Sequence, residues 1–235
     1  MGKRQVVGSM SEWSGVLRDF FRQIEDGSLS LQETQLFLEH KNPFLTAVNP
    51  FADLIADWQK FYLDVFGLET DFSNLRIPEK REGLDRLLIV AQGMTPQRLY
   101  DKCRELFPPC WKWTEKSLDE VIDFSFQTRF AKDGPYAVWV RDRIEADEEL
   151  KNLSADDLKQ KGIPGITLEE RLLYELKFFK ETGKHLDINS VTLCSGSRYS
   201  DGHVPNVFWF DDKMHVNSYH PDHADDDLRA RQAVS

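Results

Sequence analysis

Residues 207–217, VFWFDDKMHVN, carry the pattern that decides the fold of this chain. Two short runs of alternating side chains flank Asp211 and Asp212, which stand where a two-residue turn joins the strands of a β-hairpin. Cross-strand pairing about that turn gives one face of the ribbon to Val207, Trp209, Met214 and Val216. These four side chains form a conventional apolar underside, and we expect it to face a core.

The other face of the same ribbon has a different chemistry. Phe208 stands opposite His215, and Asn206 stands opposite Asn217. Aromatic, imidazole and amide groups side by side are typical of a binding surface, where rigid rings supply area and short polar groups supply adaptable hydrogen bonds. A polar hairpin that simply faces solvent is the competing interpretation of this pattern.

The polar composition extends over residues 195–231, which are dense in Ser, Tyr, Asp, His, Asn and Phe. After the ribbon, residues 219–227 form a polar, aromatic loop that cannot bury itself. Residues 228–234 then predict a closing strand, with Leu228, Ala230 and Gln232 on one side.

Upstream of the ribbon, strands and helices mix. Short apolar runs predict strands at residues 87–91, 136–140 and 191–194. Capping residues and helical spacing predict helices at 95–107, 154–162 and 167–183, and the last of these has a buried stripe of Leu168, Leu172, Leu173, Leu176 and Phe179.

The first third of the chain is helical throughout. Helices are predicted at 11–26, from Ser30 to about Lys41, and from Pro50 to Phe66. We therefore predict an α+β protein with a helical N-terminal region at 1–83 and a second domain at 84–235 that ends in a small antiparallel sheet.

The composition excludes several classes of function. A net charge of −10 disfavours a nucleic-acid partner, because phosphate binding needs clustered Lys and Arg. No apolar run is long enough for a membrane span, and no secretory signal is present. The three cysteines, Cys103, Cys110 and Cys194, lack metal-ligand spacing, which favours a reduced cytoplasmic compartment.

Three stretches carry a resemblance to a known family: GITLEERLLYEL at 165–176, LCSGSRYSDGHVP at 193–205 and DLRARQAVS at 227–235. Together they resemble the variable proteins of diversity-generating retroelements over roughly residues 130–235. The resemblance implies a fold similar to formylglycine-generating enzyme and the C-type lectins, with a helix, a strand, a variable ribbon and a closing strand that ends in an Arg-containing motif. Leu228-Arg-Ala-Arg231 departs from the commoner Gly-Phe-Arg of that motif.

The resemblance also implies which residues vary. In that family a reverse transcriptase misincorporates at adenines of a template repeat, so an AAC codon becomes codons for Tyr, His, Asp, Ser, Phe or Asn. The positions that match are Tyr199, His203, Asn206, Phe208, Phe210, His215, Asn217, Ser218, Tyr219, His220, Asp222, His223 and Asp226. Trp209, Lys213, Met214 and Gln232 cannot arise in this way, and two of them lie on the expected core face.

Two alternatives from other classes remain open. His215, His220 and His223 with Asp222 and Asp225 form the strongest candidate for a zinc site, although no His-Glu-x-x-His motif is present. The helical arm is the other candidate, as an adaptor or oligomer interface through its many aromatic residues.

Enzymatic activity is not expected. The cysteines form no reactive pair, and nothing orients Ser195 or Ser197 toward His203 as a nucleophile. We therefore expect a diversified ligand-binding protein with no catalytic residue, no resident metal and no cofactor, whose ligand is a protein.

Overall fold

The computed structural model describes residues 9–39, 49–132 and 134–235. The chain divides into two compact units, Met1–Ala52 and Asp53–Ser235. The boundary predicted at 83/84 is therefore wrong, because the third helix packs with the second unit. Within that unit the fold is mixed α+β, as the sequence predicts.

In the first unit, α1 (Met10–Glu25) and α2 (Leu31–Leu38) follow one another. Ser30 caps α2, and the side chain of Glu33 returns to the Ser30 backbone N–H, which confirms the predicted capping box. The expected end of this helix at Lys41 lies outside the described residues.

The second unit begins with α3 (Ala52–Phe66), which packs on a strand pair of β1 (Arg86–Val90) and β3 (Tyr136–Val140). The two strands are antiparallel, with Leu88 opposite Val138. The Trp58 indole N–H donates to the Leu87 carbonyl at 3.2 Å, and the Tyr62 hydroxyl donates to the Ile89 carbonyl at 2.8 Å. These buried bonds attach α3 to β1 and explain why the domain boundary precedes this helix.

The larger sheet has the order β2-β6-β5-β4-β7 among the described residues. Its strands are β2 (Cys110–Lys112), β4 (Val191–Leu193), β5 (Val204–Phe210), β6 (Lys213–Tyr219) and β7 (Leu228–Ala230). The central strands pair antiparallel as expected, but the edge strands β2 and β7 both pair in parallel. The prediction of an antiparallel sheet is therefore confirmed for the central strands and wrong at both edges.

The chain after β7 does not extend as a strand to Val234. Instead, Gln232 bridges Gly165 and Val234 bridges Trp139, so the last residues cross from the larger sheet to the β1–β3 pair. Leu228 and Ala230 share a buried side, as predicted. Gln232 is only partly buried.

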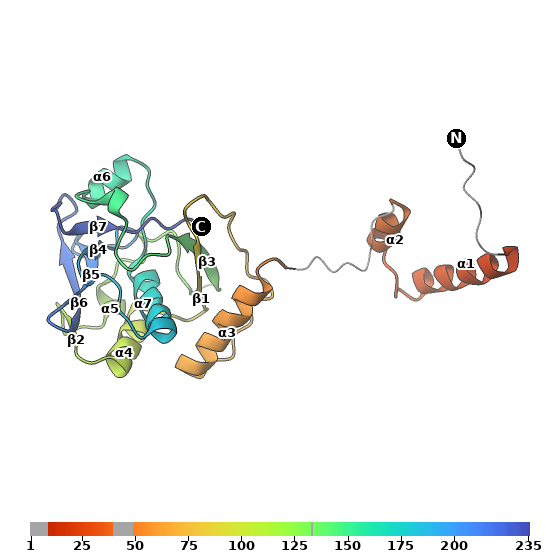
Figure 1. The fold of residues 1–235 in the computed structure, drawn as a ribbon, viewed down its shortest axis with the longest axis horizontal. Helices are drawn as coiled ribbons and strands as arrows, with labels where there is room; N and C mark the ends of the chain where they lie inside the picture. Colours follow the sequence, from red (N-terminus) through yellow and green to blue (C-terminus); the bar gives the residue numbers. More distant parts are fainter. Residues whose placement is uncertain (1–8, 40–48, 133) are drawn as a thin grey trace. The chain divides into compact units, whose positions relative to one another are not determined.

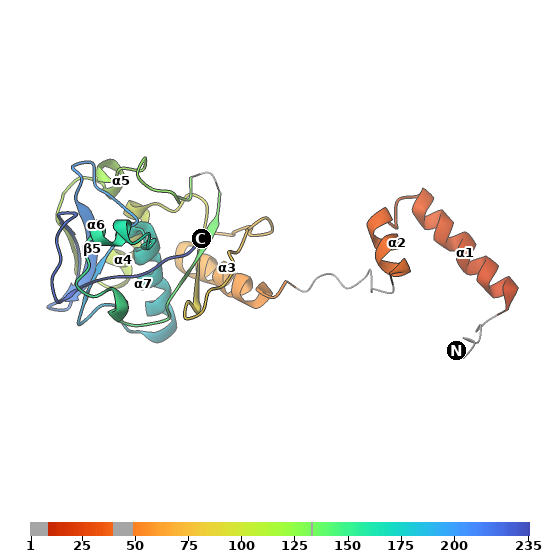
Figure 2. The ribbon, with the colours of Figure 1, turned by 90° about the horizontal axis from the view of Figure 1, so that it is seen from above.

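Helix α7 (Leu168–Thr182) lies between the larger sheet and the β1–β3 pair (Figures 1 and 2). The Thr167–Glu170 capping box begins it, and Gly183 ends it in the left-handed conformation with φ +68°. Every residue from Leu168 to Phe178 is buried, which is much more than the predicted stripe. A helix enclosed on all sides buries its charged residues too, and these need partners within the protein.

Smaller helices complete the unit: α4 (Pro96–Leu106), α5 (Leu118–Val121), the 3₁₀ turn η1 (Glu148–Leu150) and α6 (Ala155–Gln160). α4 packs on α7. α6 and η1 cover one end of the outer side of the larger sheet, where a cluster joins Leu150, Ala155, Leu158, Leu193, Val204, Leu228 and Ala230.

Candidate functional site

The β5–β6 ribbon has the predicted register. Asp211 and Asp212 form its turn with φ of +51° and +55°, so the two aspartates stand in the left-handed region that a type I′ turn requires. Trp209 pairs with Met214, and Phe208 pairs with His215. The assignment of the two faces from the sequence alone is confirmed.

The inner face of the ribbon is held by polar as well as apolar contacts. Met214 is fully buried, whereas Trp209 is only partly buried. The Trp209 ring stacks on His185 with centroids 3.6 Å apart, and its indole N–H donates to Glu175 at 3.1 Å. Glu175 lies on α7, so Trp209 connects the ribbon to the central helix.

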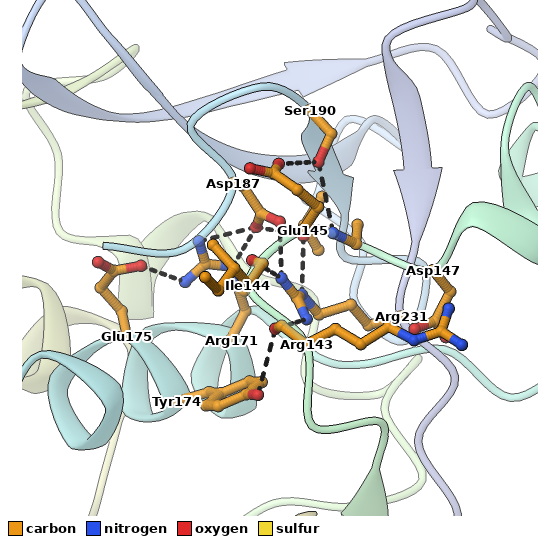
Figure 3. A network of polar contacts seen from close by, with 12 residues as sticks. Arg143, Ile144, Glu145, Asp147, Arg171, Tyr174, Glu175, Asp187, Ser190 and Arg231 are labelled. Carbon is orange, nitrogen blue, oxygen red and sulfur yellow. Dashed lines mark hydrogen bonds and ion pairs between the residues drawn. The ribbon is translucent and has the colours of Figure 1, made fainter. Parts of the chain in front are cut away.

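Beneath the sheet, Arg231 and Arg171 meet at Asp187 (Figure 3). Each guanidinium lies within 2.8 Å of an Asp187 carboxylate oxygen, and all three side chains are buried. Arg171 also bonds Glu175 at 2.7 Å, while Arg231 donates to the Ile144 carbonyl at 2.7 Å. Burial alone raises the pKa of the Asp187 carboxyl, but the two guanidinium charges outweigh it, so the pKa lies below its ordinary value.

This network gives a structural role to Arg231, the last residue of the Arg-containing motif at 228–231. Arg231 follows β7 directly, and its side chain binds the chain before β4 and the segment at residues 143–144. Through Asp187, the chain before β4 and the chain after β7 are thereby joined to Arg171 of α7.

The outer face carries a group of aromatic rings around His215. Phe208 stacks on His215 with centroids 5.0 Å apart and an interplanar angle of 12°, while Phe210 approaches the same imidazole edge-on at 6.4 Å. Phe210 is 69% exposed. Trp111 of β2 lies beside His215 at 5.5 Å and is 44% exposed.

Sequence reasoning missed Trp111. It lies almost a hundred positions before the ribbon, and β2 is too short to show a periodic pattern. The available signal was a large aromatic residue shortly after Pro108-Pro109, a pair that ends a helix and is compatible with an edge strand. Only the parallel pairing of β2 with β6 shows that Trp111 extends the outer face.

A second group of side chains lies at the far end of the ribbon and in the following loop. The Tyr219 ring stacks on His223 at 4.3 Å, and His223 Nε2 lies 2.8 Å from an Asp225 carboxylate oxygen. His203 and His220 face each other with Nε2 atoms 3.3 Å apart. Tyr219 also packs against the cluster under α6, so part of its surface is structural.

Two of the predicted contact residues are buried, and their assignment as displayed side chains is wrong. Tyr199 is 1% exposed because its backbone bridges Ile122 and its ring packs on Trp113 at 5.3 Å. Asn206 is 0% exposed because it pairs with Leu193, at the end of the outer face that α6 covers. Among the described residues neither polar atom of its amide has a hydrogen-bond partner.

The other predicted residues lie on the surface or are partly buried. The exposed residues are Phe210, His220, Asp222 and Asp226. Partly buried are His203, Phe208, His215, Asn217, Ser218, Tyr219 and His223. The described contacts thus form two groups, one around His215 and one around Tyr219, His220 and His223 at the far end of the ribbon.

The alternative zinc site is not assembled. In the part of the chain that the structure describes, no group of three or more His, Cys, Asp or Glu side chains is placed to hold a metal ion. His215 belongs to the Phe208 group, whereas His220 and His223 belong to the loop and contact different partners.

The cysteines show no sign of activation. Cys103 and Cys194 are buried, and desolvation raises the pKa of both thiols. Burial also raises the pKa of Cys110 to about 12. A thiol with a raised pKa is a poor nucleophile at neutral pH.

No family model, curated protein or solved structure matches this chain. Within the described residues, none of the helices combines the length and the apolar character that crossing a bilayer requires.

Proposed function

We propose that the chain is a diversified ligand-binding protein, a target of retroelement mutagenesis, which binds a protein ligand without covalent chemistry. The binding surface is the outer face of the β5–β6 ribbon with the loop at residues 220–227, on a C-type-lectin-like scaffold. One observation carries the proposal: of the three ribbon residues that an altered AAC codon cannot encode, Trp209 and Met214 lie on the inner face, and the third, Lys213, is exposed beside the turn.

The support comes from what each face contacts. On the inner face, Trp209 and Met214 need codons that the mutagenesis cannot produce, and both contact the interior of the protein. On the outer face, Phe208, Phe210 and Trp111 each make a ring contact with His215. A change on the outer face therefore removes few contacts with the rest of the fold.

The scaffold assignment rests on the order of the elements. A capped helix, a short strand, a long ribbon and a closing strand follow one another as the resemblance implies, and the Arg231 ending of the closing strand is buried against the helix. Such a base keeps the ribbon in place when its outer side chains change.

The structure also refines the contact set. Tyr199 and Asn206 leave it because they are buried, and Trp111, which lies outside residues 195–231, joins it as an exposed aromatic anchor. Aromatic side chains with accessible faces are the commonest residues to dominate protein interfaces. Phe208, Phe210 and Trp111 are therefore the proposed anchors, with His215 and Asn217 as polar contacts.

Two matched libraries test this proposal. One varies Phe208, Phe210, His215 and Asn217, and the other varies Val207, Trp209, Met214 and Val216. Both are displayed on a cell surface, probed with protease for folding and screened against a panel of proteins. We expect most members of the outer library to resist protease and some to bind, and most of the inner library to be digested. Equal digestion of both libraries would contradict the proposal.

The genetic part of the proposal has its own test. Sequencing the DNA beside the coding region should reveal a reverse-transcriptase gene and a near-copy of the segment for residues 195–231 that differs only at adenines. A near-copy with differences at other bases would exclude this mechanism.

A second candidate function, self-association through the helical arm, rests on a specific observation on α1. Val16, Leu17, Phe21 and Ile24 lie along one helix and are 41–61% exposed. Polar substitutions of Leu17 and Phe21 in the full chain should lower its mass in solution if copies associate here. An unchanged mass would exclude this interface.

A further inference from the structure

A hollow of about 630 Å³ lies in the second unit, among residues that the proposed binding surface does not use. It is bordered by the chain between β1 and α4, by α5, by residues 124–132 and by the first turn of α7. Met94, Phe130 and Ala131 give it an apolar lining. Its volume and lining are those of a pocket for a small molecule.

Two acidic side chains, Glu169 and Asp119, open into this apolar hollow. Glu169 is only 1% exposed. Lys132 also borders the hollow, but its side chain is exposed to solvent. Of the charged residues that border the cavity, Glu169 is therefore the buried one, whereas Asp119 is partly buried and Lys132 is exposed.

Among the described residues, the Glu169 carboxyl accepts a hydrogen bond from the Tyr136 hydroxyl at 3.3 Å, which is a long contact for an ionised group. The guanidinium of Arg129 is bonded instead to Glu170, at 2.8 and 3.0 Å. Glu170 also completes the capping box with Thr167. Glu170 thus has a full set of partners, whereas the adjacent Glu169 has almost none.

A buried carboxylate without a cation is unfavourable, so the protein holds Glu169 partly in its neutral form. Desolvation, followed by the charge of Glu170, raises the pKa of Glu169 to about 8. The other groups that face it are Tyr136 from β3, Asp119 from α5 and Arg129 from the segment before β3. The Tyr136 hydrogen bond and Arg129 lower the pKa, and Asp119 raises it.

We propose that this hollow binds a small organic cation, whose ammonium group pairs with Glu169 while its apolar body packs on Met94, Phe130 and Ala131. A cation supplies the charge that Glu169 lacks, and Asp119 adds attraction of the same sign. An anion would meet two acidic groups, and a neutral molecule would supply no charge to stabilise the ionised form of the carboxyl. This site is independent of the ribbon and of any ligand bound there.

Benzylamine and benzyl alcohol are matched probes, because they share a shape and differ in charge at pH 7. The full chain carries methionine labelled at its ε-methyl group, and each probe is titrated by NMR. Met94 reports on the hollow, and Met214 in the larger sheet is an internal control. We expect benzylamine to shift Met94 but not Met214, and to bind roughly tenfold more tightly than the alcohol, as a charge-assisted bond predicts. Equal affinities, or no shift of Met94, would overturn the proposal.

Glu169→Gln keeps the shape of the side chain and removes its charge. In this variant benzylamine should bind no more tightly than benzyl alcohol, whereas an undiminished preference for the amine would overturn the role of Glu169. The melting temperature checks that the variant is folded.

The wild-type protein provides a second readout that needs no variant. Because the ammonium pairs with the ionised carboxyl, binding at pH 7 should release a proton, and the affinity should rise as the pH approaches 8. Calorimetry in two buffers of different ionisation enthalpy measures this release. Binding without proton release would contradict the proposed ion pair.

Discussion

The inner and outer faces of the β5–β6 ribbon are built from the same stretch, residues 204–219, yet they are held in different ways. The inner face contacts α7 through Trp209 and lies above the buried Asp187 network. The outer face is held by rings that stack on each other, with Trp111 beside them. The proposed function places recognition on the side of this backbone that is opposite to the side held by the buried network.

The largest effect on stability should come from a change of Asp187, which lies beneath the inner face of the ribbon. Asp187→Ala removes a carboxylate shared by two buried guanidinium groups, so that Arg231 loses its anionic partner and Arg171 keeps only Glu175. We expect a loss of about 3–5 kcal/mol in the free energy of unfolding, measured with urea. Asp222→Ala, a change at an exposed aspartate of the loop, is the control and should change stability by less than about 0.5 kcal/mol. Similar losses in both variants would break the distinction between the two sides.

Trp209→Ala should have the next largest effect. The ring stacks on His185, and its N–H bonds Glu175, so truncation leaves a cavity and removes a hydrogen bond. We expect a loss of about 3 kcal/mol in the free energy of unfolding. Trp111→Ala is the matched control, since this indole is on the outer side and 44% exposed. A greater loss for Trp111 than for Trp209 would reverse the proposed roles of the two faces.

Lowering the pH should lower the free energy of unfolding through protonation of Asp187. The folded state lowers the pKa of Asp187 below its ordinary value of 3.8, so this group stabilises the fold fully above that pH. Its contribution is lost as the pH falls from about 4 through the lower pKa of the folded state, because the carboxylate then takes up a proton and no longer balances the two guanidinium charges. Urea unfolding between pH 7 and pH 2.5 measures this loss. Asp187→Asn should show a flatter dependence, and an identical slope would assign the acid sensitivity to other carboxyls.

The ribbon could be predicted from the sequence because its signals are local. The alternation of residues 207–217 and the Asp211-Asp212 turn determine the register without help from the rest of the chain. The capping boxes at Ser30, Ser154 and Thr167 are local in the same way, and all three are present.

What could not be predicted depends on long-range packing. Residues outside the ribbon decide the burial of Asn206 and Tyr199: Asn206 lies where α6 covers the sheet, and Tyr199 pairs with Ile122. The parallel pairing of β2 with β6, which adds Trp111, carries no local signal. The charged residues of α7 look solvent-exposed in a helical pattern, and only the packing of α7 between the larger sheet, α4 and β1 explains why they are buried.

The smallest effect on stability should come from the outer face, where the effect on binding is greatest. Phe208→Ala with Phe210→Ala removes two rings that each contact His215 on the outer face, so we expect a loss below about 1 kcal/mol in the free energy of unfolding. Binding of a protein recovered from the panel screen should be lost, because both proposed anchors are gone. Adding Tyr219→Ala should lower stability further, since this ring also packs against the cluster under α6. Retained binding in the double variant would contradict the role of these rings as anchors for the ligand. A stability loss as large as that of Trp209→Ala would show that the outer face is part of the core.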